Sequence, residues 1–381
     1  MMDRRRFLVT ASAASAALLV PKLAFAAAET ERRLVFIIQR GAADGLHIIP
    51  PLGDPDYAKV RESMMTDPAT ATRLDNTFAL HPSLAETAKM YRAGEALFVH
   101  AVASPYRDRS HFDGQNVIET GGSAPYAIKD GWLNRLAAML PKAKTPPIAF
   151  SPVMPMALRG TAAVTSYASS TMPAANVDLL ARVGMLYQND ALLHPLWSAA
   201  METRGIAGDQ GAGQDPASIG KLTASFLSRA DGPRIAMMET TGWDTHNQQE
   251  PRLARLLSGF DAMLAALRVG MGTNWSKTTV LVATEFGRTV AVNGTRGTDH
   301  GTAAAAMLLG GAVKGGRVIA DWPGLSQAAL LDGRDLKPTI ALNALIAGAV
   351  GESIGIDPER VSRVLFPDVK VGDAITGLTV S

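Results

Sequence analysis

Acidic and histidine side chains, the residue types that bind divalent cations without sulfur, gather in three short stretches of this chain. Asp244 and His246 are separated by one residue, Glu285 follows, and Asp299 and His300 are adjacent. Carboxylate oxygen and imidazole nitrogen are ligands for hard and borderline metal ions. We therefore predict a divalent metal site that uses these five residues, and the pattern does not choose among zinc, magnesium, manganese and calcium.

A second group, Arg107, Ser110 and His111, has the residue types of nucleophilic catalysis. Ser110 precedes a helix predicted over residues 111–119, and a helix N-terminus favours developing negative charge. A nearby cation would lower the pKa of the Ser110 hydroxyl, and Arg107 would clamp an anionic oxyacid group through its planar guanidinium. The alternative is structural: Ser110 as a helix cap and Arg107 as part of a solvated charge cluster.

Each candidate metal ligand also has a structural explanation when it is taken alone. An isolated Asp-x-His caps helices or bonds within turns, Glu285 can pair with Arg288, and Asp299-His300 lies between glycines as turn residues do. Their shared placement after strands favours a functional interpretation over these separate ones.

The composition of the chain and the motifs it lacks exclude several kinds of chemistry. The chain has no cysteine, so disulfides, thiolate metal sites, iron–sulfur clusters and cysteine nucleophiles are ruled out. It also lacks the nucleophile elbow Gly-x-Ser-x-Gly, the phosphate loop and the glycine-rich dinucleotide motif. These absences count against an α/β-hydrolase, an NTPase and a dehydrogenase.

The elements that must position these residues are predicted from hydropathy. Continuous apolar runs rich in β-branched residues predict buried strands over residues 34–38, 96–102, 234–238 and 278–284. Helical periodicity lies between them, over residues 83–91, 111–119 and 251–269. The alternation predicts an α/β fold, a three-layer sandwich whose mainly parallel central sheet has helices on both faces. Ligands bind beyond the carboxyl ends of such strands, where the candidate residues lie.

Residues 1–26 are predicted to be an export signal. Three arginines at positions 4–6 precede an apolar stretch over residues 7–20, and the segment ends in Ala-Phe-Ala. Residues 3–8 resemble a twin-arginine signal, which carries folded proteins; an ordinary arginine-rich secretory signal is the alternative. The apolar stretch is too short for a membrane span. We expect a periplasmic or otherwise exported chain that is soluble after cleavage.

Loss of the leader changes the charge of the protein. The full chain carries +2, whereas residues 27–381 carry −1, because the leader holds four basic residues and one acidic residue. A near-neutral chain gives no support for nucleic-acid binding or for an anionic membrane surface. We predict that residues 27–381 form a single domain with a helical insertion at about 174–230.

Five ordered motifs resemble an exported bacterial family known as domain of unknown function 1501, which is grouped with the alkaline phosphatase and sulfatase superfamily. The motifs are RGAADGL (40–46), SPYR with SHFDGQ (104–107 and 110–115), GWDTH (242–246), TEFGRT (284–289) and GTDHG (297–301). The resemblance implies the alkaline-phosphatase-like fold. It also implies hydrolysis of phosphate or sulfate esters with one or two metal ions and a nucleophile at a helix start.

The resemblance also implies roles for individual residues. Ser110 stands near the nucleophile position, Asp244 and His246 resemble a metal-binding pair, and His300 resembles the last metal-binding histidine.

The motifs depart from the family pattern in three ways, the first being that the spacing from aspartate to histidine is shortened to the Asp-x-His of Asp244 and His246. Phe286 replaces a ligating histidine, and Arg40 stands where an aspartate ligand is expected, so Asp44 becomes a sixth candidate ligand. Altered geometry, or one metal in place of two, follows from these departures.

The predicted function is therefore that of an exported metal-dependent hydrolase of phosphate or sulfate esters, with an anionic small molecule as substrate and the twin-arginine machinery as its export partner. A catalytically degenerate scaffold or binding protein, working with another exported protein, is the alternative. A metal-free serine hydrolase using Ser110 and His111 is a third possibility.

Overall fold

The computed structural model describes residues 31–140, 145–168, 176–207 and 215–380. The predicted leader, residues 1–26, lies outside these ranges, and so does the end of the chain at Ser381. Within the described residues, no helix has the length and apolarity needed to cross a bilayer.

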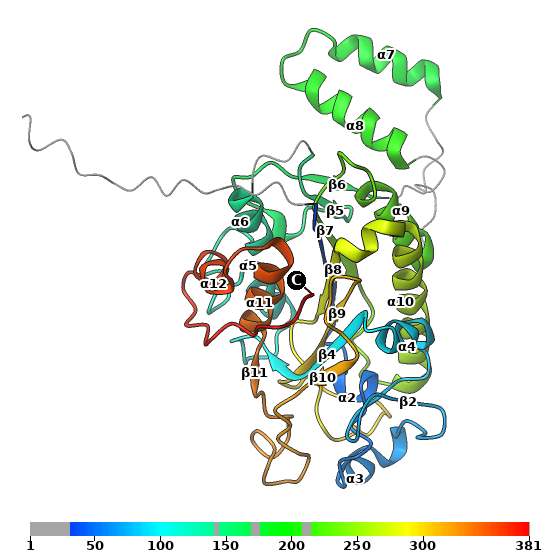
Figure 1. Cartoon of the computed structure of the whole chain (residues 1–381), viewed down its shortest axis with the longest axis vertical. Helices are drawn as coiled ribbons and strands as arrows, with labels where there is room; N and C mark the ends of the chain where they lie inside the picture. Colours follow the sequence, from blue (N-terminus) through cyan, green and yellow to red (C-terminus); the bar gives the residue numbers. More distant parts are fainter. Residues whose placement is uncertain (1–30, 141–144, 169–175, 208–214, 381) are drawn as a thin grey trace, which may run out of the picture.

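A single large sheet runs through the centre of the molecule (Figure 1). Its order is β10-β4-β9-β8-β1-β7-β5-β6, and β11 pairs with β4. Every neighbouring pair is parallel except those made by β9, which runs antiparallel to β4 and β8. The strands are β1 (Arg33–Gln39), β4 (Ala96–Ala103), β5 (Ile148–Phe150), β6 (Thr165–Tyr167), β7 (Ile235–Thr240), β8 (Thr278–Ala283), β9 (Ala304–Leu309), β10 (Arg317–Ile319) and β11 (Ile340–Ala341). A separate hairpin joins β2 (Thr72–Arg73) to β3 (Ala79–Leu80).

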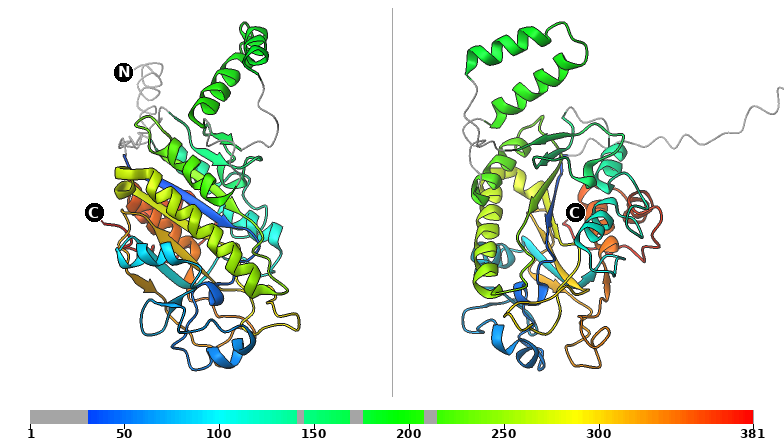
Figure 2. Two further views of the ribbon diagram at one scale, coloured as in Figure 1. Left: turned by 90° about the vertical axis from the view of Figure 1, so that its right-hand side faces the viewer. Right: turned by 180° about the vertical axis from the view of Figure 1, so that it is seen from behind.

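Helices cover both faces of this sheet (Figure 2). One face packs on α4 (Ala85–Arg92), α9 (Pro216–Leu227) and α10 (Gln249–Met271), and the other on α6 (Trp132–Met139), α11 (Leu342–Ile354) and α12 (Pro358–Leu365). Alternate residues of β1 enter the two cores, as the pleat of a strand requires. The remaining helical elements are α2 (Gly45–Ile48), α3 (Tyr57–Arg61), α5 (His111–Thr120), α7 (Val177–Tyr187), α8 (Leu193–Ala207) and the 3₁₀ turns Glu62–Met64, Met156–Leu158 and Gly272–Lys277. The predicted α/β class, a mainly parallel sheet between helical layers, is confirmed.

The range predicted to be a helical insertion holds α7, α8 and α9. Helix α9 packs closely on α10, since a Cβ at Gly220 would meet the Met263 carbonyl oxygen at 2.2 Å. Helices α7 and α8 instead project from one end of the molecule (Figures 1 and 2). Large apolar side chains on these two helices are exposed, including Met185 and Leu186. The insertion boundaries remain a prediction.

Buried histidine in the core makes stability depend on pH. His100 in β4 is completely buried, its Nδ1 accepts the Ala101 N–H at 2.8 Å, and its Nε2 therefore donates to the Ile49 carbonyl at 3.2 Å. Burial lowers the pKa of His100 to about 4, against about 6.5 in an unfolded chain. His47 and His81 have pKa values lowered by burial in the same way.

We expect the free energy of unfolding to fall as pH drops from about 6.5 to 4. In that window the unfolded chain binds a proton that folded His100 does not, so stability is complete above the unfolded pKa and is lost by up to about 3 kcal/mol on acidification. Urea unfolding at several pH values measures this. His100→Gln should flatten the dependence, whereas His194→Gln, at an exposed site on α8, should not. Equal slopes in all three proteins would contradict the assignment.

Candidate metal centre

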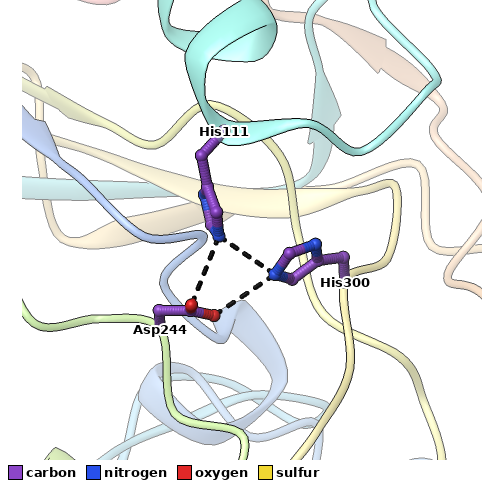
Figure 3. Close-up of side chains that lie close together, drawn as sticks. All are labelled: His111, Asp244 and His300. Atoms are coloured by element: carbon purple, nitrogen blue, oxygen red, sulfur yellow. Dashed lines mark hydrogen bonds and ion pairs between the residues drawn. The ribbon is translucent and has the colours of Figure 1, made fainter.

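Three side chains from distant parts of the chain meet beyond the carboxyl ends of the strands (Figure 3). Nε2 of His111 lies 3.0 Å from Nε2 of His300 and 3.5 Å from Oδ2 of Asp244. Nε2 of His300 lies 3.2 Å from Oδ1 of Asp244. One ligand atom from each residue falls within 4.8 Å of the others, so the described residues contain a candidate metal site.

A third imidazole adjoins these residues. Nε2 of His246 lies 3.0 Å from Nε2 of His300 and 2.9 Å from Oδ1 of Asp244. The Nε2 atoms of His111, His246 and His300 thus each lie within 3.5 Å of an oxygen of the Asp244 carboxylate. We call His111, Asp244, His246 and His300 the metal cluster.

Outer hydrogen bonds fix which ring nitrogen of each histidine faces the cluster. Each Nδ1 lies against an oxygen acceptor: His111 against Glu285 Oε1 at 2.8 Å, His246 against Asp299 Oδ1 at 3.1 Å, and His300 against the Arg109 carbonyl at 3.0 Å. These oxygens accept, so each neutral imidazole carries its proton on Nδ1 and turns the lone pair of Nε2 inward. This is how metal-binding histidines are held by their outer partners.

Nε2 of His300 lies 3.0 Å from Nε2 of His111 and 3.0 Å from Nε2 of His246, and lone pairs this close repel one another unless positive charge lies among them. The hydrogen bond to Glu285 raises the pKa of His111, so a proton can take that place. Burial lowers the pKa of His300, and the neighbouring positive charges of His111 and Arg288 lower it further. A divalent cation would satisfy all three nitrogens together and displace the proton, so the donor set fits a metal ion.

Two carboxylates stand behind the imidazoles. Glu285 is fully buried and also accepts hydrogen bonds from the Gly41 N–H at 2.8 Å and from Gln115 at 3.0 Å. Burial would raise the pKa of Glu285, but the hydrogen bonds from His111 and Gln115 outweigh it and the pKa is lowered. Hydrogen bonds from Asn293 and His246 lower the pKa of Asp299. Both acids stay ionised and orient the rings.

Arg288 fixes the single carboxylate of the metal cluster. Its buried guanidinium donates to Oδ1 of Asp244 at 2.5 Å. Burial would raise the pKa of Asp244, but the Arg288 charge outweighs it and the pKa is lowered. The same guanidinium donates to four main-chain carbonyls, those of Gly41, Ala42, Trp243 and Thr298. Arg288 thus connects the loops that follow β1, β7 and β8.

A family model described as "Protein of unknown function (DUF1501)" matches residues 31–365. The chain belongs to this family. The resemblance carried by the five motifs is thereby confirmed at the level of the family, and a search of curated proteins finds no match.

Solved structures similar to this DUF1501 chain share little sequence with it. They include the C-terminal periplasmic domain of EcEptC from Escherichia coli in complex with Zn, with 10% identity, 73% of this chain and 72% of that chain covered, and a TM-score of 0.39. A protein in the alkaline phosphatase superfamily from Vibrio parahaemolyticus has 11% identity, 90% and 78% coverage, and a TM-score of 0.37. The phosphonate monoester hydrolase of Agrobacterium radiobacter has 10% identity, 76% and 70% coverage, and a TM-score of 0.33.

The structure of this DUF1501 chain does not bring Asp44 to the metal cluster. The Asp44 carboxylate is buried, and it pairs with Arg61 at 2.6 Å while also accepting from Gln249 at 2.6 Å and from the Leu46 N–H. Burial would raise the pKa of Asp44, but the Arg61 charge outweighs it and the pKa is lowered. Its lone pairs are used by this buried ion pair, which anchors α3 and α10 to the loop after β1.

The predicted catalytic residues are divided between two places. His111 belongs to the metal cluster, whereas Arg107 donates to the carbonyls of Ser104 and Tyr106 and lines a separate cavity. Ser110 is the N-cap residue of α5, but its side chain makes no capping hydrogen bond, and its backbone N–H donates to the Tyr106 hydroxyl. The Ser110 hydroxyl therefore does not cap the helix.

Three residues that support His300, namely Arg109, Arg334 and Asp335, were not predicted in that role from the sequence. Arg109 has a positive φ of 60°, which aims its carbonyl at His300, and its guanidinium binds Oδ2 of buried Asp335 at 2.8 Å. Arg334 joins the same Asp335 to the His300 carbonyl. Arg109 and Asp335 are too far apart in the sequence for any spacing pattern to predict that they interact. His111, by contrast, could be predicted as a site residue from the sequence, because it begins the helix that follows a strand.

We expect Asp335→Asn to weaken metal binding by about 10- to 100-fold, the usual effect of losing an outer partner of a ligand. Arg109 would lose its anionic partner, and the carbonyl that orients His300 would be released. Zinc competition and the absorption bands of the cobalt-loaded protein measure the affinity and the ligand geometry. Asp332→Asn, on the exposed part of the same loop, is the matched control. Equal zinc affinity in both variants would contradict the role of Asp335.

Proposed function

We propose that this DUF1501 chain is an exported metal-dependent hydrolase of phosphate or sulfate esters. The observation that carries the proposal is the convergence of three imidazole Nε2 atoms on one carboxylate, each ring being fixed through its Nδ1. Motif resemblance to a superfamily of such hydrolases supports the substrate class. Export rests on the twin-arginine-like leader.

The donor set favours a borderline transition metal. Three imidazoles and one carboxylate suit zinc and its neighbours, whereas magnesium and calcium prefer sites made mostly of oxygen. His111, Asp244 and His300 would hold the ion, with His246 as the fourth proposed ligand. When bound, such an ion acts as a Lewis acid on a phosphoryl or sulfuryl oxygen and offsets the negative charge that develops there.

Charge within the site favours an anionic substrate. The histidine rings are neutral donors when they bind a metal, and Asp244 is already paired with the buried Arg288 guanidinium. A divalent ion and Arg288 would together balance the three ionised carboxylates of Asp244, Glu285 and Asp299. The positive charge at the ion itself would then attract an oxyanion and repel a cation.

Ser110 is the proposed nucleophile. It is half-buried, it directly precedes His111, and it begins a ten-residue helix whose N-terminus favours negative charge. In the proposed step, Ser110 Oγ bonds to phosphorus or sulfur, the bond to the ester oxygen breaks, and the serine proton ends on the departing alcohol. Water then hydrolyses the serine ester and restores the hydroxyl.

The test combines metal analysis with turnover of aryl phosphates and aryl sulfates by the exported, folded chain. We expect about one equivalent of metal and turnover that chelators remove. Ser110→Ala should lower the rate roughly 1,000-fold or more while metal content is retained. Ser123→Ala, an exposed serine bonded to Asp368, is the control. Absence of both stoichiometric metal and turnover would overturn the proposal and favour a degenerate scaffold or binding protein.

A further inference from the structure

Arg40 begins the first of the five motifs, yet it cannot bind a metal ion, because a guanidinium offers donors and no lone pair. Its side chain directly follows β1 and is 18% exposed. Nη1 of Arg40 donates to Glu119 Oε1 at 2.8 Å and to Gln115 Oε1 at 3.0 Å. Nε donates to Glu239 Oε2 at 2.7 Å. Contacts from α5 and β7 therefore hold this guanidinium in one place.

The two carboxylates that bind Arg40 are themselves held by neutral donors. Oε2 of buried Glu119 accepts the Ala157 N–H at 3.1 Å. Oε1 of Glu239 accepts the Ser151 hydroxyl at 2.7 Å. Each carboxylate thus gives one oxygen to Arg40 and the other to a neutral group. Because hydrogen bonds between charged partners are the stronger kind, Arg40 is a firm anchor.

Gln115 connects this anchor to the metal cluster. Its Oε1 accepts from Arg40, and its Nε2 donates to Glu285 Oε1 at 3.0 Å. Arg40 can only donate and an ionised carboxylate can only accept, so a single orientation of the amide satisfies both. The same oxygen of Glu285 lies 2.8 Å from Nδ1 of His111. A line of hydrogen bonds thus joins Arg40 to the ring of His111 through one amide and one carboxylate.

The spacing along α5 places these groups on one side of the helix. Gln115 lies four residues after His111, and Glu119 lies four residues after Gln115. Residues four apart are neighbours on a helix surface. One face of α5 therefore carries a metal-cluster ligand, the amide behind it and the acid that fixes Arg40.

We propose that Arg40 and Gln115 are positioning residues of the metal cluster. Arg40 orients the Gln115 amide, and the amide holds Glu285 behind the ring of His111. The inference rests on the metal centre of the proposed function but not on ester hydrolysis.

The test measures zinc competition and the absorption bands of the cobalt-loaded full chain. We expect Gln115→Met, which keeps the length of the side chain and removes both hydrogen bonds, to weaken zinc binding about tenfold. The cobalt bands should shift, because the His111 ring is held less firmly. Ser151→Ala removes a hydrogen bond from Glu239, on the far side of Arg40, and should change neither readout. This control gives the effect of lost stability alone.

A double-mutant cycle tests whether Arg40 acts through Gln115. Arg40→Lys keeps the charge but not the planar fork, so it should weaken zinc binding by a smaller factor than Gln115→Met. In the Gln115→Met background it should have no further effect.

Two results would overturn the proposal while leaving the metal centre intact. One is zinc affinity and cobalt bands that are unchanged in Gln115→Met. The other is losses of zinc affinity from Arg40→Lys and Gln115→Met that add in full. A wild-type chain that binds no zinc would overturn the proposed function as well.

Discussion

Replacing His300 with alanine is expected to lower the zinc affinity of the chain roughly 1,000-fold, because one of four donors is lost from the centre of the metal cluster. Nε2 of His300 is the atom nearest to all the other donors, at 3.0 Å from His111, 3.0 Å from His246 and 3.2 Å from Asp244. Ester hydrolysis should fall with metal content.

Metal content after dialysis, together with zinc competition, measures the loss. His194→Ala is the matched control, since that histidine is exposed on α8. A His300→Ala protein that kept one tightly bound equivalent of zinc would show that the metal cluster is not the binding site.

Replacing Arg288 with methionine is expected to reduce the free energy of unfolding by about 4 kcal/mol, because each buried acceptor that loses its donor costs about 1 kcal/mol or more. The Arg288 side chain is completely buried. Without it, four main-chain carbonyls lose a donor and Asp244 loses its counter-charge. Urea unfolding measures the change.

Two further variants separate charge from geometry. Arg288→Lys retains the charge but cannot reach all five acceptors, so its loss should be intermediate. Arg296→Met removes an exposed ion pair with Glu250 and should cost less than about 1 kcal/mol. Equal losses for Arg288→Met and Arg296→Met would contradict the connecting role of Arg288.

The four strands that position the site were predictable because each is a short, continuous apolar run buried on both faces. Strand β9 was not predicted, although it separates β4 from β8. Its sequence, AAAMLL, has an intrinsic preference for helix. It forms a strand because β4 and β8 offer hydrogen-bonding edges on both sides, so tertiary context outweighs local propensity.

The site could be predicted in outline. The predicted strand ends indicated that Asp244, His246 and His300 would lie close together, because parallel strands bring the loops that follow them to one edge of the sheet. The sequence could not show that Glu285 stands behind the ring of His111, because ligand and supporting residue have the same chemistry. Nor could it show that Asp44 forms an ion pair with Arg61, since that pairing depends on where α3 lies in the folded chain.

The wide separation of the metal-cluster residues along the chain has a consequence for the order of events in the cell. His111, Asp244 and His300 are neighbours only after most of the sheet has assembled, so an extended polypeptide would offer its ligands one at a time. Binding that requires the native state adds its own free energy to folding. Under the proposed function, metal insertion would then be a late event, and the compartment where the chain folds would decide which ion it acquires. For a chain translocated already folded, that compartment is the cytoplasm.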